Sequence, residues 1–152
     1  MKTIIIFLAM LPVLLAFGDN EGVSENTKEN KTKIMELTKD EFIKRVYNYE
    51  ANPNEWKYEG DKPCVVDFHA TWCAPCKMLA PSLEELNQEF NGQINIYKVD
   101  VDKSPELAAI FGVRSVPTLL WIPINGKPSI TQGALPKSQL ESIIKNTLLK
   151  KE

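Results

Sequence analysis

Two cysteines three positions apart, Cys73 and Cys76, are the residues of this chain whose types and spacing point most directly to chemistry. A cysteine thiolate is a nucleophile, and a pair of neighbouring thiols can attack a disulfide and then close into a disulfide themselves. The pair therefore predicts thiol–disulfide exchange. The same spacing also forms half of a zinc site, so a second pair of ligands has to be sought.

The other candidate zinc ligands are Cys64 and His69, the only histidine of the chain. Both fall in a predicted strand, in which residues five positions apart point to opposite faces. A closed zinc site needs four convergent ligands. We therefore expect no metal site. Structural zinc held by these two residues together with Cys73 and Cys76 is the weaker alternative.

The elements that flank the cysteines must position them. The largely apolar run Val65–Phe68 precedes the pair and predicts a buried strand. Apolar residues at helical spacing follow the pair and predict a helix whose inner face carries Leu79, Leu83, Leu86 and Phe90. The cysteines are thus expected at the point where a strand turns into a helix.

A helix N-terminus presents unpaired N–H groups and the positive end of the helix dipole, which favour a thiolate over a thiol. Cys73 is nearest the helix start, so we expect it to be the exposed, activated and attacking sulfur. Cys76 is expected to be less exposed, to lie on the same helical face and to close the ring. Pro75 suits the first helical turn, where its missing N–H costs little.

Asp67 is the unusual residue of the predicted strand. Alternation places its side chain on the same face as Val65 and His69. A buried carboxylate costs on the order of several kcal/mol unless it stays protonated or finds a partner. Asp67 is therefore either functional or satisfied by a donor from elsewhere in the chain.

The segment Phe68–Lys77 resembles the active-site segment of thioredoxins. The likeness continues in that family's order and spacing through residues 98–102, 113–118 and 133–135, and it covers roughly residues 34 to 150. It implies a thioredoxin-like α/β fold, a three-layer sandwich with a mixed central sheet flanked by helices. It also implies a monomeric protein-disulfide reductase that acts on disulfide-containing proteins and needs no cofactor.

The resemblance also implies roles for single residues. Asp67 matches the buried aspartate that assists proton transfer at the resolving Cys76, and Lys98 matches the lysine beside that aspartate. A solvated strand end is the alternative for Lys98. Pro117 matches the cis-proline that faces the cysteine pair, where backbone pairing would hold an extended substrate segment. The substrate-binding residues implied in this way are Trp72, Ala74, Pro75, Val116, Pro117 and Gly133.

Two positions depart from the family's usual pattern. Ala74 replaces the glycine commonly found between the cysteines, and residues there tune redox poise, so the direction of the reaction stays open. His69 replaces an aromatic residue. Histidine changes charge near neutral pH and could tune the cysteines, although an ordinary hydrogen-bonded side chain is the commoner role. Cys64 is expected to be a buried core thiol, because free cysteine packs as a small hydrophobic residue.

Local signals predict the elements before the central strand. A short strand is expected at 34–37. Thr38 and Glu41 form a capping-box pattern that predicts a helix, which the Asn52-Pro53-Asn54 segment should end. Trp56 and Tyr58 follow in a loop, and we expect them to pack on the domain rather than to contact a partner.

Further signals predict the elements after the cysteine pair. Pro81 is expected to bend the helix that contains it. Ser104 should cap a helix that begins at Pro105, and Asn125-Gly126 predicts a hairpin turn after a buried strand at 118–122. Pro136 should open a last helix, whose inner face carries Leu140, Ile143, Ile144 and Leu148.

Composition is that of an ordinary globular protein, with 152 residues, 43% hydrophobic and 25% charged side chains, and a net charge of −2. One domain is expected, at 34–152, and the near-neutral charge gives no reason to expect nucleic acid as a partner. Residues 1–18 are typical of a secretory signal peptide, with Lys2, an apolar stretch and a small-residue cleavage pattern. Polar residues 19–33 predict a flexible linker.

These features predict an exported thioredoxin, periplasmic or secreted, or membrane-tethered if the signal is not cleaved. A membrane or soluble thiol–disulfide electron donor would recharge it. A disulfide oxidase or isomerase that uses the same cysteines is the alternative that an oxidising compartment favours. A non-catalytic binding module is a third possibility, and the presence of both cysteines, Asp67 and Pro117 argues against it.

Overall fold

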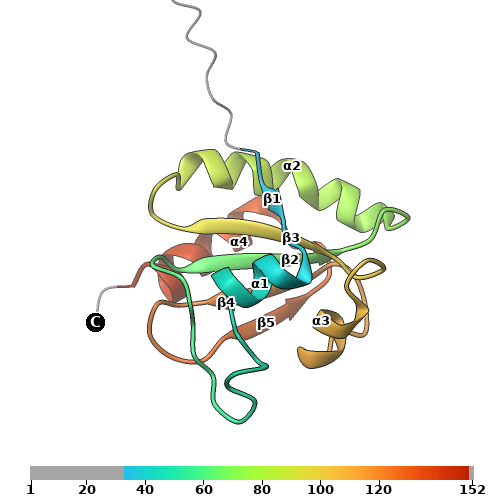
Figure 1. Cartoon of the computed structure of the whole chain (residues 1–152). Coiled ribbons are helices and arrows are strands. Elements are labelled where there is room, and N and C mark those ends of the chain that lie inside the picture. Colours follow the sequence, from blue (N-terminus) through green and yellow to red (C-terminus); the bar gives the residue numbers. More distant parts are fainter. Residues whose placement is uncertain (1–32, 151–152) are drawn as a thin grey trace, which may run out of the picture. The chain divides into compact units, whose positions relative to one another are not determined.

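The computed structural model describes residues 33–150, which form a five-stranded sheet in the order β1-β3-β2-β4-β5 (Figure 1). The strands are β1 (Met35–Glu36), β2 (Cys64–His69), β3 (Asn95–Asp100), β4 (Thr118–Ile122) and β5 (Ser129–Gln132). The first three in sheet order are parallel, and β4 and β5 join antiparallel. The sheet is therefore mixed, as expected, with β2 at its centre.

Helices cover both faces of the sheet (Figure 1). They are α1 (Lys39–Arg45), α2 (Ala74–Glu89), α3 (Pro105–Ile110) and α4 (Lys137–Ile143), which continues as the π-helical turn η1 (Ile144–Leu148). Side chains of α2 and α4 pack on the face of β2 that carries Val65, whereas α1 and α3 pack on the face that carries Val66. The fold is the three-layer sandwich that the sequence predicts.

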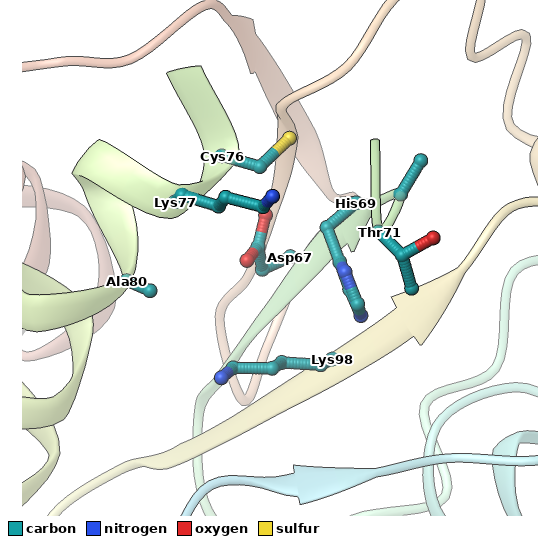
Figure 2. Close-up of a pocket in the computed structure, with 8 residues that line it drawn as sticks. Asp67, His69, Thr71, Cys76, Lys77, Ala80 and Lys98 are labelled. Atoms are coloured by element: carbon teal, nitrogen blue, oxygen red, sulfur yellow. The ribbon is translucent and has the colours of Figure 1, made fainter. Parts of the chain in front are cut away.

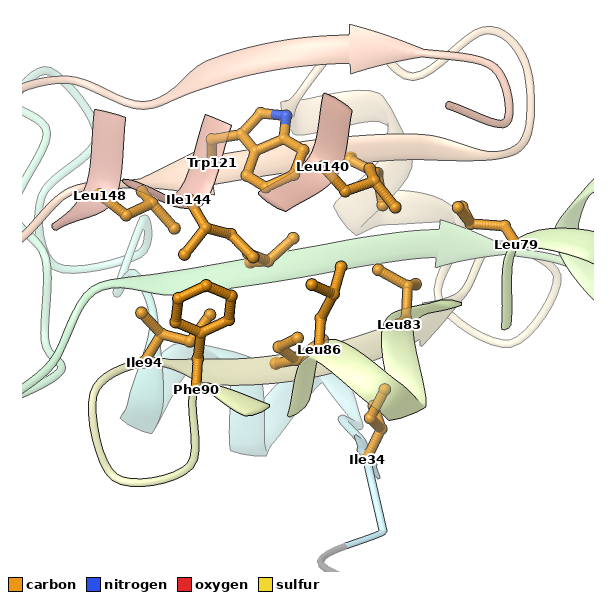
Figure 3. Packing of buried hydrophobic residues seen from close by; sticks show 13 residues of the cluster. Ile34, Leu79, Leu83, Leu86, Phe90, Ile94, Trp121, Leu140, Ile144 and Leu148 are labelled. Carbon is orange, nitrogen blue, oxygen red and sulfur yellow. The ribbon is translucent and has the colours of Figure 1, made fainter. Parts of the chain in front are cut away.

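The core beneath α2 fixes the position of the helix that starts at the cysteines (Figure 3). Leu79, Leu83 and Leu86 are almost fully buried there, and burial of each leucine stabilises the fold by about 2 kcal/mol. Trp121 of β4 packs in the same cluster and donates its indole N–H to the Thr131 hydroxyl at 2.9 Å. The leucine spacing therefore predicts the inner face of α2 correctly.

The first helix begins as predicted but ends earlier. The Thr38 hydroxyl accepts the Glu41 N–H at 3.3 Å and the Glu41 carboxylate accepts the Thr38 N–H at 2.9 Å, which completes the capping box. The helix stops at Arg45 rather than near Asn52, because the Val46 carbonyl accepts the N–H of Glu59 at 3.0 Å. The segment that contains Glu59 thus occupies a carbonyl group that a further turn of the helix would use.

The segment between α1 and β2 folds back on the domain. Tyr47 and Tyr58 form an isolated antiparallel bridge that closes its base. The rings of Tyr47 and Trp56 lie 4.6 Å apart, and the Tyr58 hydroxyl donates to the Lys62 carbonyl at 2.5 Å. Trp56 and Tyr58 are both partly buried against the core, which confirms that these aromatics pack on the domain.

Three later elements differ in detail from expectation. Ser104 is the N-cap residue of α3, but its side chain makes no capping hydrogen bond. Asn125-Gly126 lies within a longer connection, residues 123–128, because β4 ends at Ile122 and β5 starts at Ser129. The last helix widens into η1, and Ile143 is only partly buried.

Pro81 lies inside α2, which continues through it to Glu89. The bend expected there stays a prediction.

The predicted signal peptide at 1–18 and all of the predicted linker except Lys33 lie outside the described residues. Within residues 33–150, no helix combines the length and hydropathy that crossing a bilayer requires.

Candidate redox site

Cys73 and Cys76 lie where β2 turns into α2 and are joined by a disulfide, with Cα atoms 5.3 Å apart. Cys73 is the N-cap residue of α2, and its Sγ accepts the Cys76 N–H at 3.2 Å. Ala74 and Pro75 form the first exposed turn of the helix. A sulfur in this place has both a hydrogen-bond donor and the positive helix end to stabilise a thiolate.

The expected difference in exposure between the two sulfurs is wrong. Cys73 is 3% exposed and Cys76 is 5% exposed, so both cysteines are buried. Val101 and Val116 pack against them, and both valines come from segments distant in the sequence. The asymmetry of the pair therefore lies in the N–H bonded to the Cys73 Sγ, not in exposure to solvent.

Asp67 lies beneath the cysteine pair, on β2, and is 2% exposed. It lines a cavity of about 130 Å³ together with Cys76, His69 and Lys98, as Figure 2 shows. Its Oδ1 is buried and has no hydrogen-bond partner among the described residues. Burial raises the pKa of Asp67 to about 7, and the ammonium of Lys98 opposes that rise. The carboxyl can therefore exchange a proton near neutral pH.

Lys98 is the direct neighbour of Asp67 across β2 and β3. It is not the solvated strand end of the alternative interpretation, since its side chain is mostly buried and lines the Asp67 cavity. Its Nζ forms an ion pair with Glu84 Oε1 at 3.6 Å, on α2. Glu84 was not singled out from the sequence. It lies eight residues after Cys76 and four after Ala80, and this spacing along one helical face is the signal that could have identified it.

A second pocket, of about 160 Å³, lies beside the cysteines and is lined by Trp72, Val101, Val113, Arg114, Ser115 and Val116. Trp72 is 69% exposed, and its Nε1 donates to Asp102 Oδ2 at 2.8 Å. Asp102 was not predicted to act at the site, and no local pattern marks it, because the contact joins residues 30 positions apart. The pocket offers an exposed aromatic ring beside the cysteine pair.

The peptide bond between Val116 and Pro117 is cis, as the resemblance implies. Pro117 is buried, and its carbonyl accepts the Gly133 N–H at 2.8 Å. Gly133 has φ of +86°, a conformation that residues with a Cβ rarely adopt. The structure thus brings Pro117 and Gly133 together and places Val116 in the pocket beside Trp72.

Cys64 lies at the opposite end of β2 from the cysteine pair and is fully buried, which confirms a core thiol. Burial raises its pKa to about 12, and a hydrogen bond with Tyr58 opposes the rise. Its side chain belongs to the Val66 face, whereas His69 lines the Asp67 cavity. Cys64 and His69 therefore do not converge. No group of three or more His, Cys, Asp or Glu side chains in residues 33–150 is placed to hold a metal ion.

The sequence model of the thioredoxin family matches residues 33–146. The chain is 43% identical over 112 residues to the thioredoxin of Borreliella burgdorferi, a match that covers 74% of this chain and 95% of that protein. It is 54% identical over 85 residues to the thioredoxin of Haemophilus influenzae, which covers 55% of this chain and 78% of that protein. The identities are therefore high across most of the domain.

A solved structure agrees with these sequence matches. The crystal structure of chloroplastic thioredoxin z superposes with a TM-score of 0.60 at 29% identity, over 74% of this chain and 92% of that one. The family match contains the strand-to-helix turn with both cysteines, the buried Asp67 and the cis-proline. With sequence, fold and site in agreement, this chain belongs to the thioredoxin family of thiol–disulfide oxidoreductases.

Proposed function

We propose that this protein is an exported protein-disulfide reductase in which Cys73 attacks the substrate disulfide and Cys76 resolves the mixed disulfide. The observation that carries the proposal is the division of surroundings between the two sulfurs. The Sγ of Cys73 accepts an N–H at the start of α2, whereas Cys76 lines the cavity that contains the buried Asp67. The surroundings of Cys73 thus favour its thiolate form, and Cys76 is placed to give its proton to Asp67 when it attacks the mixed disulfide.

The first half of the reaction uses the Cys73 thiolate of the reduced protein. It attacks one sulfur of a substrate disulfide, the substrate S–S bond breaks, and one substrate thiolate leaves with its electron pair. The product is a disulfide between Cys73 and the substrate. The Cys76 N–H that bonds the Cys73 Sγ supports the thiolate before this attack.

In the second half, the Cys76 thiol gives its proton to the Asp67 carboxylate, and the resulting thiolate attacks the Sγ of Cys73. The mixed disulfide breaks, the second substrate thiolate leaves, and the Cys73–Cys76 disulfide forms. The substrate gains two electrons from the dithiol. Lys98 moderates the basicity of Asp67 through its charge, as the opposing effect on the Asp67 pKa indicates.

The substrate is a protein with an accessible disulfide, bound as an extended segment along the pocket beside the cysteines. Trp72 and Val116 line this pocket, Ala74 and Pro75 present an exposed turn, and Pro117 is linked to Gly133 by a hydrogen bond. Backbone pairing at Val116 would hold segments of varied sequence. The protein acts as a monomer in this proposal.

Export is supported by the signal-peptide pattern of residues 1–18 and the polar segment that follows it. The proposal places the domain in the periplasm or outside the cell, or tethers it to the membrane if the signal is retained. A thiol–disulfide donor, membrane-bound or soluble, then returns the cysteines to the dithiol state.

The test combines turnover with redox equilibrium. The domain should reduce insulin with a dithiol reductant, and equilibration with glutathione should give a reduction potential near the value of about −270 mV that is typical of thioredoxins. The Cys73→Ser variant is the matched control without an attacking sulfur. A potential near about −120 mV would show an oxidase instead, and substrate binding without turnover would show a binding module.

Export is tested separately with a reporter enzyme that is active only outside the cytoplasm. Fusion to residues 1–33 should give activity, and fusion to residues 19–33 should not. Equal activity of the two fusions would refute the signal.

A further inference from the structure

His69 and Asp67 lie on the same face of β2, two residues apart, and both line the cavity that Cys76 borders (Figure 2). Each contributes a buried polar atom without a hydrogen-bond partner among the described residues, Oδ1 of Asp67 and Nε2 of His69. Buried polar atoms are nearly always paired, so two unpaired atoms around one cavity require an explanation.

The cavity can connect these two atoms. The Cα atoms of residues two apart on a strand are about 6.6 Å from each other, and both side chains line this cavity, so a water held in it can lie between their polar atoms. The cavity volume is about 130 Å³, well above the roughly 15 Å³ that a single water requires. A water bound there would satisfy both atoms and link them.

The two residues also differ in their access to solvent. Asp67 is 2% exposed, whereas the His69 side chain is 17% exposed. A proton that Asp67 takes from Cys76 must move on to solvent, because while it stays on Asp67 it can return to the Cys76 thiolate before that thiolate attacks. Lys77 and Lys98 also border the cavity, but an ammonium group that is already protonated cannot accept it. A neutral imidazole can.

Glu36 of β1 is placed to stabilise the imidazolium that would form. Its Oε2 lies 3.6 Å from His69 Nε2, and its Oε1 is bonded to the Lys103 ammonium at 2.6 Å, which holds the carboxylate in place. Charged or titratable groups face His69 from β2 itself, from the neighbouring strand β3, from the edge strand β1, from α2 and from the loop after β3. They are Asp67, Lys98, Asp100, Glu36, Lys77 and Lys103.

We propose that His69 acts through Asp67 as the relay that passes the resolving proton to solvent, with the charge of Glu36 stabilising the imidazolium. The proposal rests on the proposed role of Asp67. The Cys76 thiol protonates Asp67, the Asp67 carboxyl passes a proton through the bridging water to His69 Nε2, and the imidazolium releases a proton to bulk buffer. Each group is returned to its starting state, and the Cys76 electron pair forms the new S–S bond.

The test uses the reduced full chain and an aromatic disulfide whose two halves each leave as a coloured thiolate. The first coloured phase reports attack by Cys73, and the second reports resolution by Cys76. The His69→Ala variant should keep the first rate and slow the second on the order of tenfold at pH 7, less than for a group that reacts directly. Added imidazole should restore the second rate in this variant, because it can enter the emptied cavity.

Two further variants separate a relay from a structural role. The His69→Phe variant fills the same space and should be slow without rescue, and His69→Gln keeps a polar side chain that cannot carry the proton and should also be slow. In the wild-type protein and in all three variants the second rate should rise with pH as the Asp67 carboxyl loses its proton near pH 7, and the three variants should level off at a lower rate above that pH. Circular dichroism and thermal unfolding establish that each variant is folded.

The relay is overturned if His69→Gln resolves at the wild-type rate, or if imidazole fails to accelerate His69→Ala. It is also overturned if Asp67→Asn resolves normally, since His69 would then have no proton to pass. An oxidising reduction potential would overturn the reductase proposal but leave the relay intact, because the aromatic disulfide reports resolution in either physiological direction.

Discussion

Asp67 and Lys98 are direct partners across β2 and β3, but the Lys98 ammonium forms its ion pair with Glu84 on α2, 3.6 Å away. The buried carboxyl of Asp67 is thereby left with one oxygen unpaired and a pKa of about 7. At this position burial raises the pKa of Asp67 more than the charge of Lys98 lowers it. The effect can be measured on the free energy of unfolding and on the rate of disulfide resolution.

The Asp67→Asn variant should be more stable than the wild-type protein, and only at higher pH. The folded protein binds a proton at Asp67 up to about pH 7, whereas an unfolded carboxyl releases it near pH 4. Wild-type unfolding free energy therefore falls between those two values and stays low above them. Urea unfolding of the oxidised proteins should show a gain on the order of 3 kcal/mol at pH 8 and almost none at pH 4.

The exposed Asp61→Asn change is the matched control and should show no such pH dependence. An equal effect of Asp67→Asn at pH 4 and pH 8 would mean that the carboxyl does not titrate between folded and unfolded states as described.

The Glu84→Gln variant should lower the pKa of Asp67, because it frees the Lys98 ammonium to turn toward the carboxylate. The midpoint of the pH profile of resolution should move to lower pH, and NMR titration of the Asp67 carboxyl carbon should move with it. Glu85→Gln is the control, since Glu85 pairs with Lys137 on another face of α2. A midpoint that shifts equally in both variants would point to a general loss of negative charge.

The Cys76→Ser variant should accumulate mixed disulfides with protein substrates through Cys73, whereas Cys73→Ser should accumulate almost none. The reason is the N–H at the Cys73 Sγ, since the two cysteines are equally buried. Non-reducing gels followed by mass spectrometry identify the trapped species. Comparable trapping by both variants would reverse or abolish the assignment of roles.

The Asp102→Ala variant should weaken substrate binding, because the Trp72 indole loses its hydrogen-bond acceptor and its ring is no longer held beside the pocket. A bond of this kind is worth about 1 kcal/mol, so KM for insulin should rise about fivefold with kcat little changed. Asp102→Asn keeps an acceptor and should restore most of the affinity. A fall in kcat at constant KM would place Asp102 in the chemistry instead.

Cys64 should resist alkylation in the folded protein, because burial raises its pKa to about 12 and blocks access. In a Cys73→Ser, Cys76→Ser background, labelling by iodoacetamide should be at least about 100-fold slower than in urea. Rapid labelling of the folded form would indicate that the far end of β2 opens.

The sequence predicts the site where its signals are local. The strand, the turn and the leucine face of α2 lie within 25 residues of one another, and they place Cys73 at the helix start and Asp67 beneath it. The packing of Val101 and Val116 against the cysteine cluster, and the pairing of Lys98 with Glu84, depend on contacts between distant segments. A local pattern carries no information about such partners, so it predicts an exposed Cys73 where the structure has a buried one.

The bridge between Tyr47 and Tyr58 has a consequence for protein engineering. This bridge holds together the two ends of the segment between Tyr47 and Tyr58, here called the lobe. A peptide inserted at its exposed tip, Pro53-Asn54, would extend a loop whose closure is already fixed. The entropy cost of lengthening such a loop grows only with the logarithm of its length. Surface tips of this kind accept insertions well, so the lobe is a natural graft point for an epitope or a targeting domain that leaves the redox chemistry undisturbed.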